Sequence, residues 1–440
     1  MNTFVLKKSK LYANMLLFAF WLIGGVPFFG QELASGVYLK LVSPILLVAD
    51  SILVFLGLSV LRNKNDKIML FLFLGISLIS TCILNRTQLI LYINGIRPYI
   101  SFLFILPIIR YFLDDLQRRA IFIKIMDKTL FVFLIMQLPC AIIQCMQYGA
   151  FDNVGGTLGW MQSGEMSTLV YLISLYFMRK RWNNSIGYLA NIKNNLILII
   201  ALFPSFLNET KVSFIYLLLY FFFLLPMDKK MIGRALVIAP IVSVIMLLVG
   251  SFYISIGGKK NTFSEEFITE YIFGDIDGRD YVEYLLDYGS DDDLVAEDDF
   301  GDLARGIKIM SIPVIWESKT HAMLSGFGLG NFKGGSNVQK TKLSEEYHWM
   351  IKGTRMTFFM FAFELGLFGL IWFLVYWILL IKKGWNTIGG IKQVVIYQII
   401  LLLITGVYNA PFTNITFGII FMYILYVSLG DKVEKDEINE

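Results

Sequence analysis

Cysteine is scarce in this 440-residue chain, which contains only Cys82, Cys140 and Cys145. All three lie in apolar runs, so the sequence has neither a disulfide framework nor the cysteine spacing of a metal site. We therefore expect them to be small buried hydrophobic residues. Histidine is scarcer still, with only His321 and His348, which leaves few candidates for a proton acceptor that titrates near neutral pH.

Charged residues are also few, at 16% of the chain against 56% hydrophobic residues, and the mean hydropathy is +0.65. This composition excludes a soluble domain and is typical of a polytopic membrane protein, in which lipid replaces water around most side chains. The apolar run after the first ten residues is too long for the core of a signal peptide, and no small-x-small cleavage motif follows it. We expect it to form the first spanning helix.

Twelve stretches are candidates for transmembrane helices, each of which needs about 20 mostly apolar residues. They predict an all-α polytopic membrane protein with about 12 transmembrane helices. The eighth stretch follows the seventh after a very short turn, so two half-buried helices are an alternative there. The stretches cover residues 11–29, 37–61, 68–84, 90–113, 129–148, 163–178, 194–207, 211–226, 234–256, 356–381, 393–408 and 412–430.

Lysine and arginine gather in alternate loops, which the positive-inside rule assigns to the cytoplasm. Lys7 and Lys8 precede the first span and Arg118 and Arg119 follow the fourth, whereas the short loops on the other side hold Arg86 and little else. This alternation predicts that both termini are cytoplasmic.

One long polar segment, residues 257–355, interrupts the spans. The alternation predicts an extracytoplasmic loop domain there, between nine helices in residues 1–256 and three in residues 356–430. Residues 431–440 are then a cytoplasmic tail. The clustered carboxylates at 291–300 lack the glycine and the distal glutamate of an EF-hand, so we interpret them as solvated acidic surface, with binding of a cation or a basic partner as the alternative.

Three alternating glycines, Gly326, Gly328 and Gly330, occur in the sequence GFGLGNF within this loop. No Gly-Lys-Ser/Thr follows to make a P-loop, and NFKGGSN indicates a turn instead. Alternate glycines still let backbone amides approach an anion closely. The sequence leaves two interpretations, an anion-binding loop and a flexible turn packed near the membrane.

Several charges are predicted to lie within or at the outer face of the membrane. Ionisable residues there are expensive and indicate function by default. A structural ion pair between Arg97 and the mid-span Asp50 is one interpretation. The other is that Arg97, Lys211, Arg305 and Arg355 converge on a membrane-embedded anion such as a lipid diphosphate, because arginine binds phosphate oxygens with two donors and lysine adds a point charge.

The chain resembles the O-antigen ligase and polymerase family of bacterial surface polysaccharide assembly over roughly residues 90–370, by arrangement more than by identity. NETKVSFIYLLL stands where the family has a Ser-x-Ser-Arg-like helix start. ARGIKIMSIPVIWESKTHAMLSGFGLGNF matches the family's loop arginine, aromatic-containing helix and G-x-G-x-G-x-F. FELGLFGL matches the E-x-G-x-x-G of the following helix, and residues 154–172 are similar to the Gly-Thr stretch before the sixth helix. The resemblance implies a GT-C-like architecture.

The resemblance also implies which cations bind the lipid diphosphate. Lys211 stands in the position of the family's helix-start arginine, and Arg305 stands in the position of its loop arginine. Arg279 in DGRDYVEYLL is a rival for the role of Arg305, and Arg97 lies at the same face. Lysine in place of arginine at position 211 is a departure from the family.

The proton acceptor is open between several residues. Counting back from Glu364, the family's histidine position falls on Arg355, and His348 lies seven residues earlier. Either His348 acts from a shifted position, or Arg355 replaces the histidine and the base lies elsewhere, for instance at Glu209. The resemblance implies no metal and no cofactor.

By resemblance, the function is that of a glycosyltransferase in the bacterial cytoplasmic membrane, which polymerises undecaprenyl-diphosphate-linked repeat units of O-antigen, capsule or exopolysaccharide at the outer leaflet. An O-antigen ligase that transfers the glycan to lipid A-core is the first alternative. A flippase for the same lipid-linked units is the second, although no internal repeat is evident, and a sensor or scaffold is a third. The implied partners are the lipid-linked glycan, the bilayer, a chain-length regulator and a flippase, with no nucleic acid.

Overall fold

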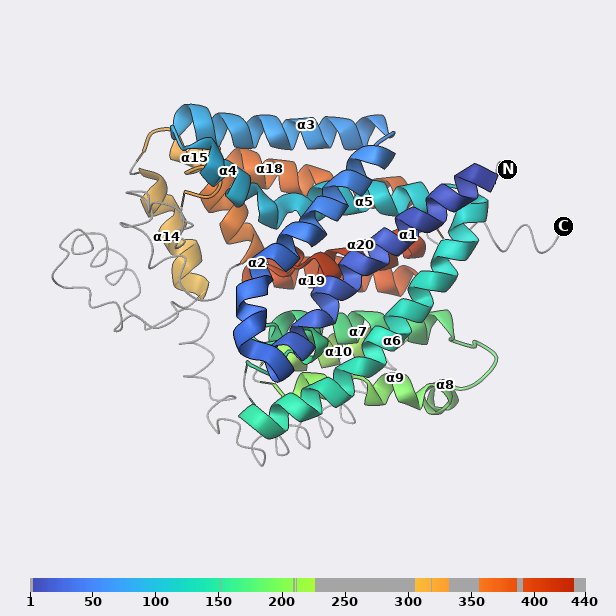
Figure 1. The fold of residues 1–440 in the computed structure, drawn as a ribbon. Coiled ribbons are helices and arrows are strands. Elements are labelled where there is room, and N and C mark those ends of the chain that lie inside the picture. The colour runs from blue at the N-terminus through green and yellow to red at the C-terminus, as the bar shows by residue number, and fades with distance from the viewer. Residues whose placement is uncertain are drawn as a thin grey trace.

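The computed structural model describes residues 3–150, 152–208, 210, 212–225, 305–317, 319–331, 356–385 and 391–430. These residues form helices and turns, without a β-strand among them, and most of the helices lie side by side in one bundle (Figure 1). The all-α class predicted from the sequence is therefore confirmed for the described residues.

Helices account for most of the described chain, with short π-helical or 3-10 segments labelled η. Their bounds are α1 (Thr3–Gly24), α2 (Val26–Val60), α3 (Lys64–Leu78), η1 (Ile79–Leu84), α4 (Leu89–Ile96), η2 (Arg97–Tyr99), α5 (Ile100–Leu113), α6 (Leu116–Tyr148), η3 (Gly156–Leu158), α7 (Ser163–Lys180), α8 (Tyr188–Asn194), α9 (Leu196–Ile200), η4 (Phe203–Phe206), α10 (Val212–Leu224), α14 (Arg305–Glu317), α15 (Ala322–Ser325), α18 (Thr357–Trp385), α19 (Lys392–Tyr408), η6 (Pro411–Thr413) and α20 (Ile415–Gly430).

Several helices have the length and hydropathy of membrane spans. Five in the described part of the chain pass both criteria, and a bent pair formed by Tyr188–Asn194 and Leu196–Phe206, at 76°, makes a sixth if it is one span. The protein is therefore an integral membrane protein with several apolar helices. The predicted count of twelve also relies on shorter helices, such as α19, and on residues 234–256, which lie outside the described residues. The five spans are Val26–Val60, Lys64–Leu84, Leu89–Leu113, Leu116–Tyr148 and Thr357–Lys382.

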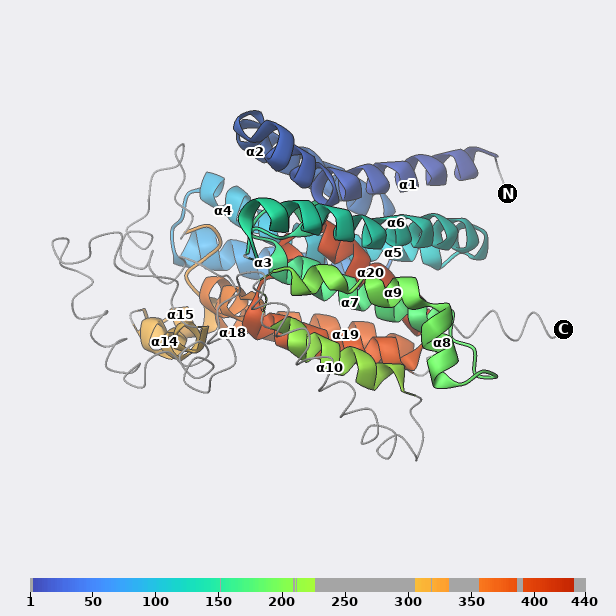
Figure 2. The same cartoon turned by 90° about the horizontal axis from the view of Figure 1, so that it is seen from below.

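Three helices, α5, α7 and α20, form the centre of the bundle and are buried on almost every face. α5 packs against α2 and α20, and α7 packs against α10, α19 and α20. Seen from below, α1 and α2 lie along one edge of the bundle and α10, α18 and α19 along the other (Figure 2). Tyrosines take part in this core through their hydroxyls; Tyr176 and Tyr423, for example, both donate to Asp127 at 2.9 Å.

The first predicted span, residues 11–29, is wrong in its end point. α1 ends at Gly24, and α2 begins at Val26 with Pro27 in its first turn. Proline is favoured there because the missing N–H needs no partner in the first turn of a helix, whereas it breaks a helix that is already running. The apolar run thus contains a helix end and a helix start, which hydropathy alone does not separate.

The two ends of the bundle differ in charge. One end, which we call the basic end, holds the starts of α1 and α6 and the ends of α5, α7 and α20. Two contacts join these helices there: Ser9 Oγ lies 3.1 Å from the Tyr111 hydroxyl, and Arg119 donates to the carbonyl of Gly430 at 3.0 Å. The distal end holds α14 and α15, away from the start of α1 (Figures 1 and 2). Basic residues of the segments predicted to be cytoplasmic lie at the basic end. Examples are Arg118 at the start of α6 and Lys180 at the end of α7.

Candidate functional site

The glycine loop, residues 326–330, is a tightly packed joint at the distal end. Each of its three glycines has a positive φ, between 67° and 87°. The amides of Phe327 and Gly328 donate to the carbonyls of Phe363 and Glu364 at 3.0 and 2.9 Å. The Leu329 amide donates to Thr81 Oγ1 at 2.8 Å. These amides have acceptors within the protein, so the loop's role as an anion cradle stays a prediction.

The partner of the glycine loop is a kink in α18. Gly366 has φ 63° and ψ −157° inside this helix, and a Cβ built on it would lie 2.6 Å from the amide nitrogen of Gly326. Two turns of backbone therefore approach each other where neither has a side chain. Glu364 lies beside this contact, is 7% exposed, and accepts a hydrogen bond from the Tyr99 hydroxyl at 2.5 Å. The joint thus ties the loop to the end of the bundle.

Arg97 forms an ion pair with Asp50, which is one of the two interpretations that the sequence left open for this arginine. Its Nε lies 2.8 Å from Asp50 Oδ2, with the two side chains 29% and 12% exposed. The pair joins η2 to α2. Arg97 therefore has a structural partner on α2.

Arg305 is the first residue of α14 and contacts the end of α19. Its Nε donates to the carbonyl of Tyr408 at 2.9 Å, and its guanidinium lies 4.4 Å from the centre of the Tyr408 ring. The last carbonyls of a helix lack intrahelical partners and carry partial negative charge, so a cation is stabilising there. This contact places a fixed positive charge at the distal end of the bundle.

Four buried polar side chains, Asn208, Thr210, Ser213 and Asn409, lie where α7, α10 and α19 meet. Arg305 contacts Tyr408, the residue before Asn409. We call these five residues the polar junction. Asn208 donates to Ser167 Oγ at 3.0 Å, which brings the start of α10 onto α7. The side-chain amide of Asn409 lies against Gly164, whose added Cβ would be 3.1 Å from Asn409 Nδ2. α7, α10 and α19 therefore meet at this point of the distal end.

Four polar atoms of the polar junction are buried without a hydrogen-bond partner among the described residues. They are Thr210 Oγ1, Ser213 Oγ and both Nδ2 and Oδ1 of Asn409. A buried polar group left unpaired costs about 1–3 kcal/mol, and native proteins keep few of them. Several such atoms close together make the polar junction a candidate site for a polar ligand.

Five of the predicted site residues lie outside the described residues: Glu209, Lys211, Arg279, His348 and Arg355. The described geometry brings the predicted Arg305 into the polar junction. It gives Arg97 and the glycine loop other partners.

Sequence reasoning missed Asn409 and Glu165. Glu165 lies in the first turn of α7, next to Gly164, within electrostatic range of Asp152 and Tyr216. A glutamate directly before a run of thirteen uncharged, largely apolar residues was a signal that could have singled it out. Asn409 lies in the sequence YNAP between two apolar helices. A polar residue there is expected in any turn, so it did not indicate a site.

The fold and the site thus define an integral membrane protein with a buried, cation-flanked polar junction at one end of its helical bundle. A scan against models of known protein families finds no match to the chain, and a search of curated proteins finds none either.

Proposed function

We propose that this protein is a glycosyltransferase that polymerises undecaprenyl-diphosphate-linked repeat units of a bacterial surface polysaccharide. The observation that carries the proposal is the polar junction, where hydroxyl and amide groups have no hydrogen-bond partner among the described residues and Arg305 contacts Tyr408, the residue before Asn409. A sugar presents hydroxyls that pair with such groups, and a diphosphate presents the negative charge that Arg305 attracts. The sequence resemblance to O-antigen polymerases and ligases supports the same assignment.

The chemistry needs charge neutralisation more than a strong nucleophile. A hydroxyl oxygen of the acceptor forms a bond to the anomeric carbon of the donor, while the bond from that carbon to the diphosphate oxygen breaks. Undecaprenyl diphosphate leaves with the electron pair, and Arg305 together with Lys211 stabilises its developing charge. The acceptor proton passes to a base, for which His348 and Glu209 are the candidates from sequence and Arg355 is a second cation.

The distribution of charge supports one orientation of the protein in the membrane. Basic residues gather at one end of the bundle and the polar junction lies at the other, which by the positive-inside rule favours an orientation with the junction at the outer leaflet. We propose twelve spans, both termini in the cytoplasm, and residues 257–355 outside. Lipid-linked repeat units would reach the polar junction from the outer leaflet.

The test is reconstitution of the purified protein in liposomes with lipid-linked repeat units as the only substrate. We expect a ladder of longer glycans on the lipid carrier, seen by gel electrophoresis and mass spectrometry. Products that appear only after lipid A-core is added would replace the polymerase by a ligase. Units that cross the bilayer without forming a new bond would replace both by a flippase.

A further inference from the structure

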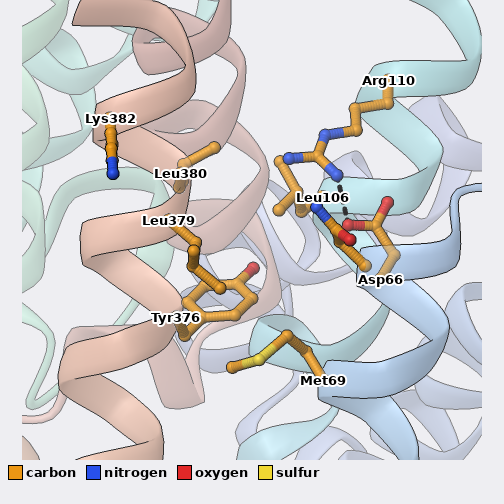
Figure 3. Close-up of a pocket in the computed structure, with 9 residues that line it drawn as sticks. Asp66, Met69, Leu106, Arg110, Tyr376, Leu379, Leu380 and Lys382 are labelled. Atoms are coloured by element: carbon orange, nitrogen blue, oxygen red, sulfur yellow. Dashed lines mark hydrogen bonds and ion pairs between the residues drawn. The ribbon is translucent and has the colours of Figure 1, made fainter.

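A second polar site lies at the basic end, far along the bundle from the polar junction. The start of α3, the end of α5 and the end of α18 enclose a half-open pocket of about 470 Å³ (Figure 3). All three helices belong to stretches with the length and hydropathy of membrane spans. The pocket therefore lies where a spanning bundle meets the headgroups of one leaflet.

The polar wall of the pocket centres on Arg110. Its side chain is only 8% exposed, Nη1 donates to Asp66, and Nε has no hydrogen-bond partner among the described residues. Lys382, an exposed lysine near the end of α18, also lines the pocket, on the other side from Arg110 (Figure 3). Arg110 and Lys382 against Asp66 leave one net positive charge, so this wall favours an anion.

The remaining wall is apolar. Leu106 and Leu379 line it, and Leu379 is 44% exposed on the lipid-facing side of α18. A ligand that fills this pocket must therefore combine a negative headgroup with an apolar body that continues into the bilayer. An inorganic anion would satisfy the cations and leave the leucines in contact with water.

We propose that this pocket binds an anionic phospholipid of the leaflet at the basic end. Its phosphate lies between Arg110 and Lys382, and the upper part of an acyl chain lies along Leu106 and Leu379. The ion pair with Asp66 already holds the Arg110 side chain in position. Binding of the lipid therefore restricts few side chains other than Lys382. The lipid then bridges α5 and α18 and stabilises their packing at the basic end.

The experiment measures lipid binding to the purified full-length protein by native mass spectrometry and by the rise in thermal stability. Phosphatidylglycerol, phosphatidylcholine and inorganic phosphate are the probes. We expect phosphatidylglycerol to bind and stabilise, phosphatidylcholine to do so much more weakly, and phosphate at millimolar concentration to have little effect. Equal stabilisation by phosphate would assign the pocket to a free anion, and equal binding of both lipids would overturn the proposal.

Two variants locate the effect. Lys382→Gln removes an exposed cation and is expected to weaken phosphatidylglycerol binding about fivefold. The double variant Arg110→Gln with Asp66→Asn keeps a neutral hydrogen-bonding pair, so the fold is retained while affinity falls about tenfold. Lys124→Gln, an exposed lysine on α6 at the same end, is the matched control. Wild-type affinity in both pocket variants would contradict the proposal, and glycan transfer is not part of the readout.

Discussion

Adding a methyl group at Gly326 is the most direct way to disturb the contact between the glycine loop and the kink of α18. Gly326 has φ 67° and ψ −169°, a combination open essentially only to glycine. A Cβ there would lie 2.5 Å from the carbonyl carbon of Glu364 and from the nitrogen of Leu365, both backbone atoms. Neither atom can move away by a side-chain rotation, so Gly326→Ala must separate the loop from α18.

The expected cost is the sum of two effects. An L-residue in this region of φ and ψ is strained by about 1–3 kcal/mol. Overpacking against a fixed backbone adds about 1–3 kcal/mol. The matched control is Gly75→Ala in the middle of α3, where an added Cβ meets nothing within 4 Å. Alanine there is expected to stabilise the protein by about 0.5–1 kcal/mol, because it restricts the unfolded chain.

The assay is thermal unfolding of the purified protein in lipid nanodiscs, with hydrogen exchange as a local readout. We expect Gly326→Ala to lower the melting temperature by about 2–6 °C and to speed exchange at the Phe327 and Gly328 amides, which donate to α18. Gly75→Ala should leave both unchanged or raise the melting temperature slightly. Equal behaviour of the two variants would refute the packing argument.

Three further predictions follow from other parts of the molecule. Asp50→Asn leaves the partly buried Arg97 without its carboxylate partner and should destabilise the protein by about 1–3 kcal/mol in thermal unfolding. Adding Arg97→Gln should recover part of that loss. If Asp50→Asn has no effect on stability, the ion pair is dispensable. Burial, and then the charge of Lys319, lower the pKa of His321, so the unfolded chain binds its proton first and stability should fall as the pH drops below about 6.5. His321→Gln should flatten that dependence, and an unchanged pH profile would assign it to other groups. Lys211→Ala should lower glycan transfer by about one to two decades while Lys211→Arg retains activity, and full activity of Lys211→Ala at normal protein levels would remove it from the site.

The helices were largely predictable because their apolar runs are long. The stretches 163–178 and 393–408 correspond to α7 and α19 within two residues, since polar residues bound each run sharply. The break at Gly24–Gly25 and the bend between α8 and α9 were missed, because local backbone geometry rather than hydropathy decides them. The overall count of spans is less accessible for the same reason.

The candidate site was predictable only in part, because the sequence shows which polar and charged residues are present but not which residues they contact in the fold. Arg305 was singled out as a cation near the outer face, and it does contact the end of α19. The sequence left the glycine loop open between an anion-binding loop and a packed turn, and only the structure shows that three of the loop's own amides donate to α18 and Thr81. Asn409 gave no signal, because its burial without a partner among the described residues depends on the contact between α7 and α19, which are far apart in the chain.

The central claim, that the polar junction is the site of glycan transfer, is tested most directly by its own side chains. Turnover of lipid-linked repeat units in liposomes should be measured for Arg305→Ala and Asn409→Ala, with Arg86→Ala as control. Arg86 is an exposed cation at the same end with no partner among the described residues. At equal protein levels and melting temperatures, we predict that each junction variant loses about one to two decades of transfer rate and that the Arg86 variant keeps the wild-type rate. Wild-type turnover in both junction variants would contradict the account.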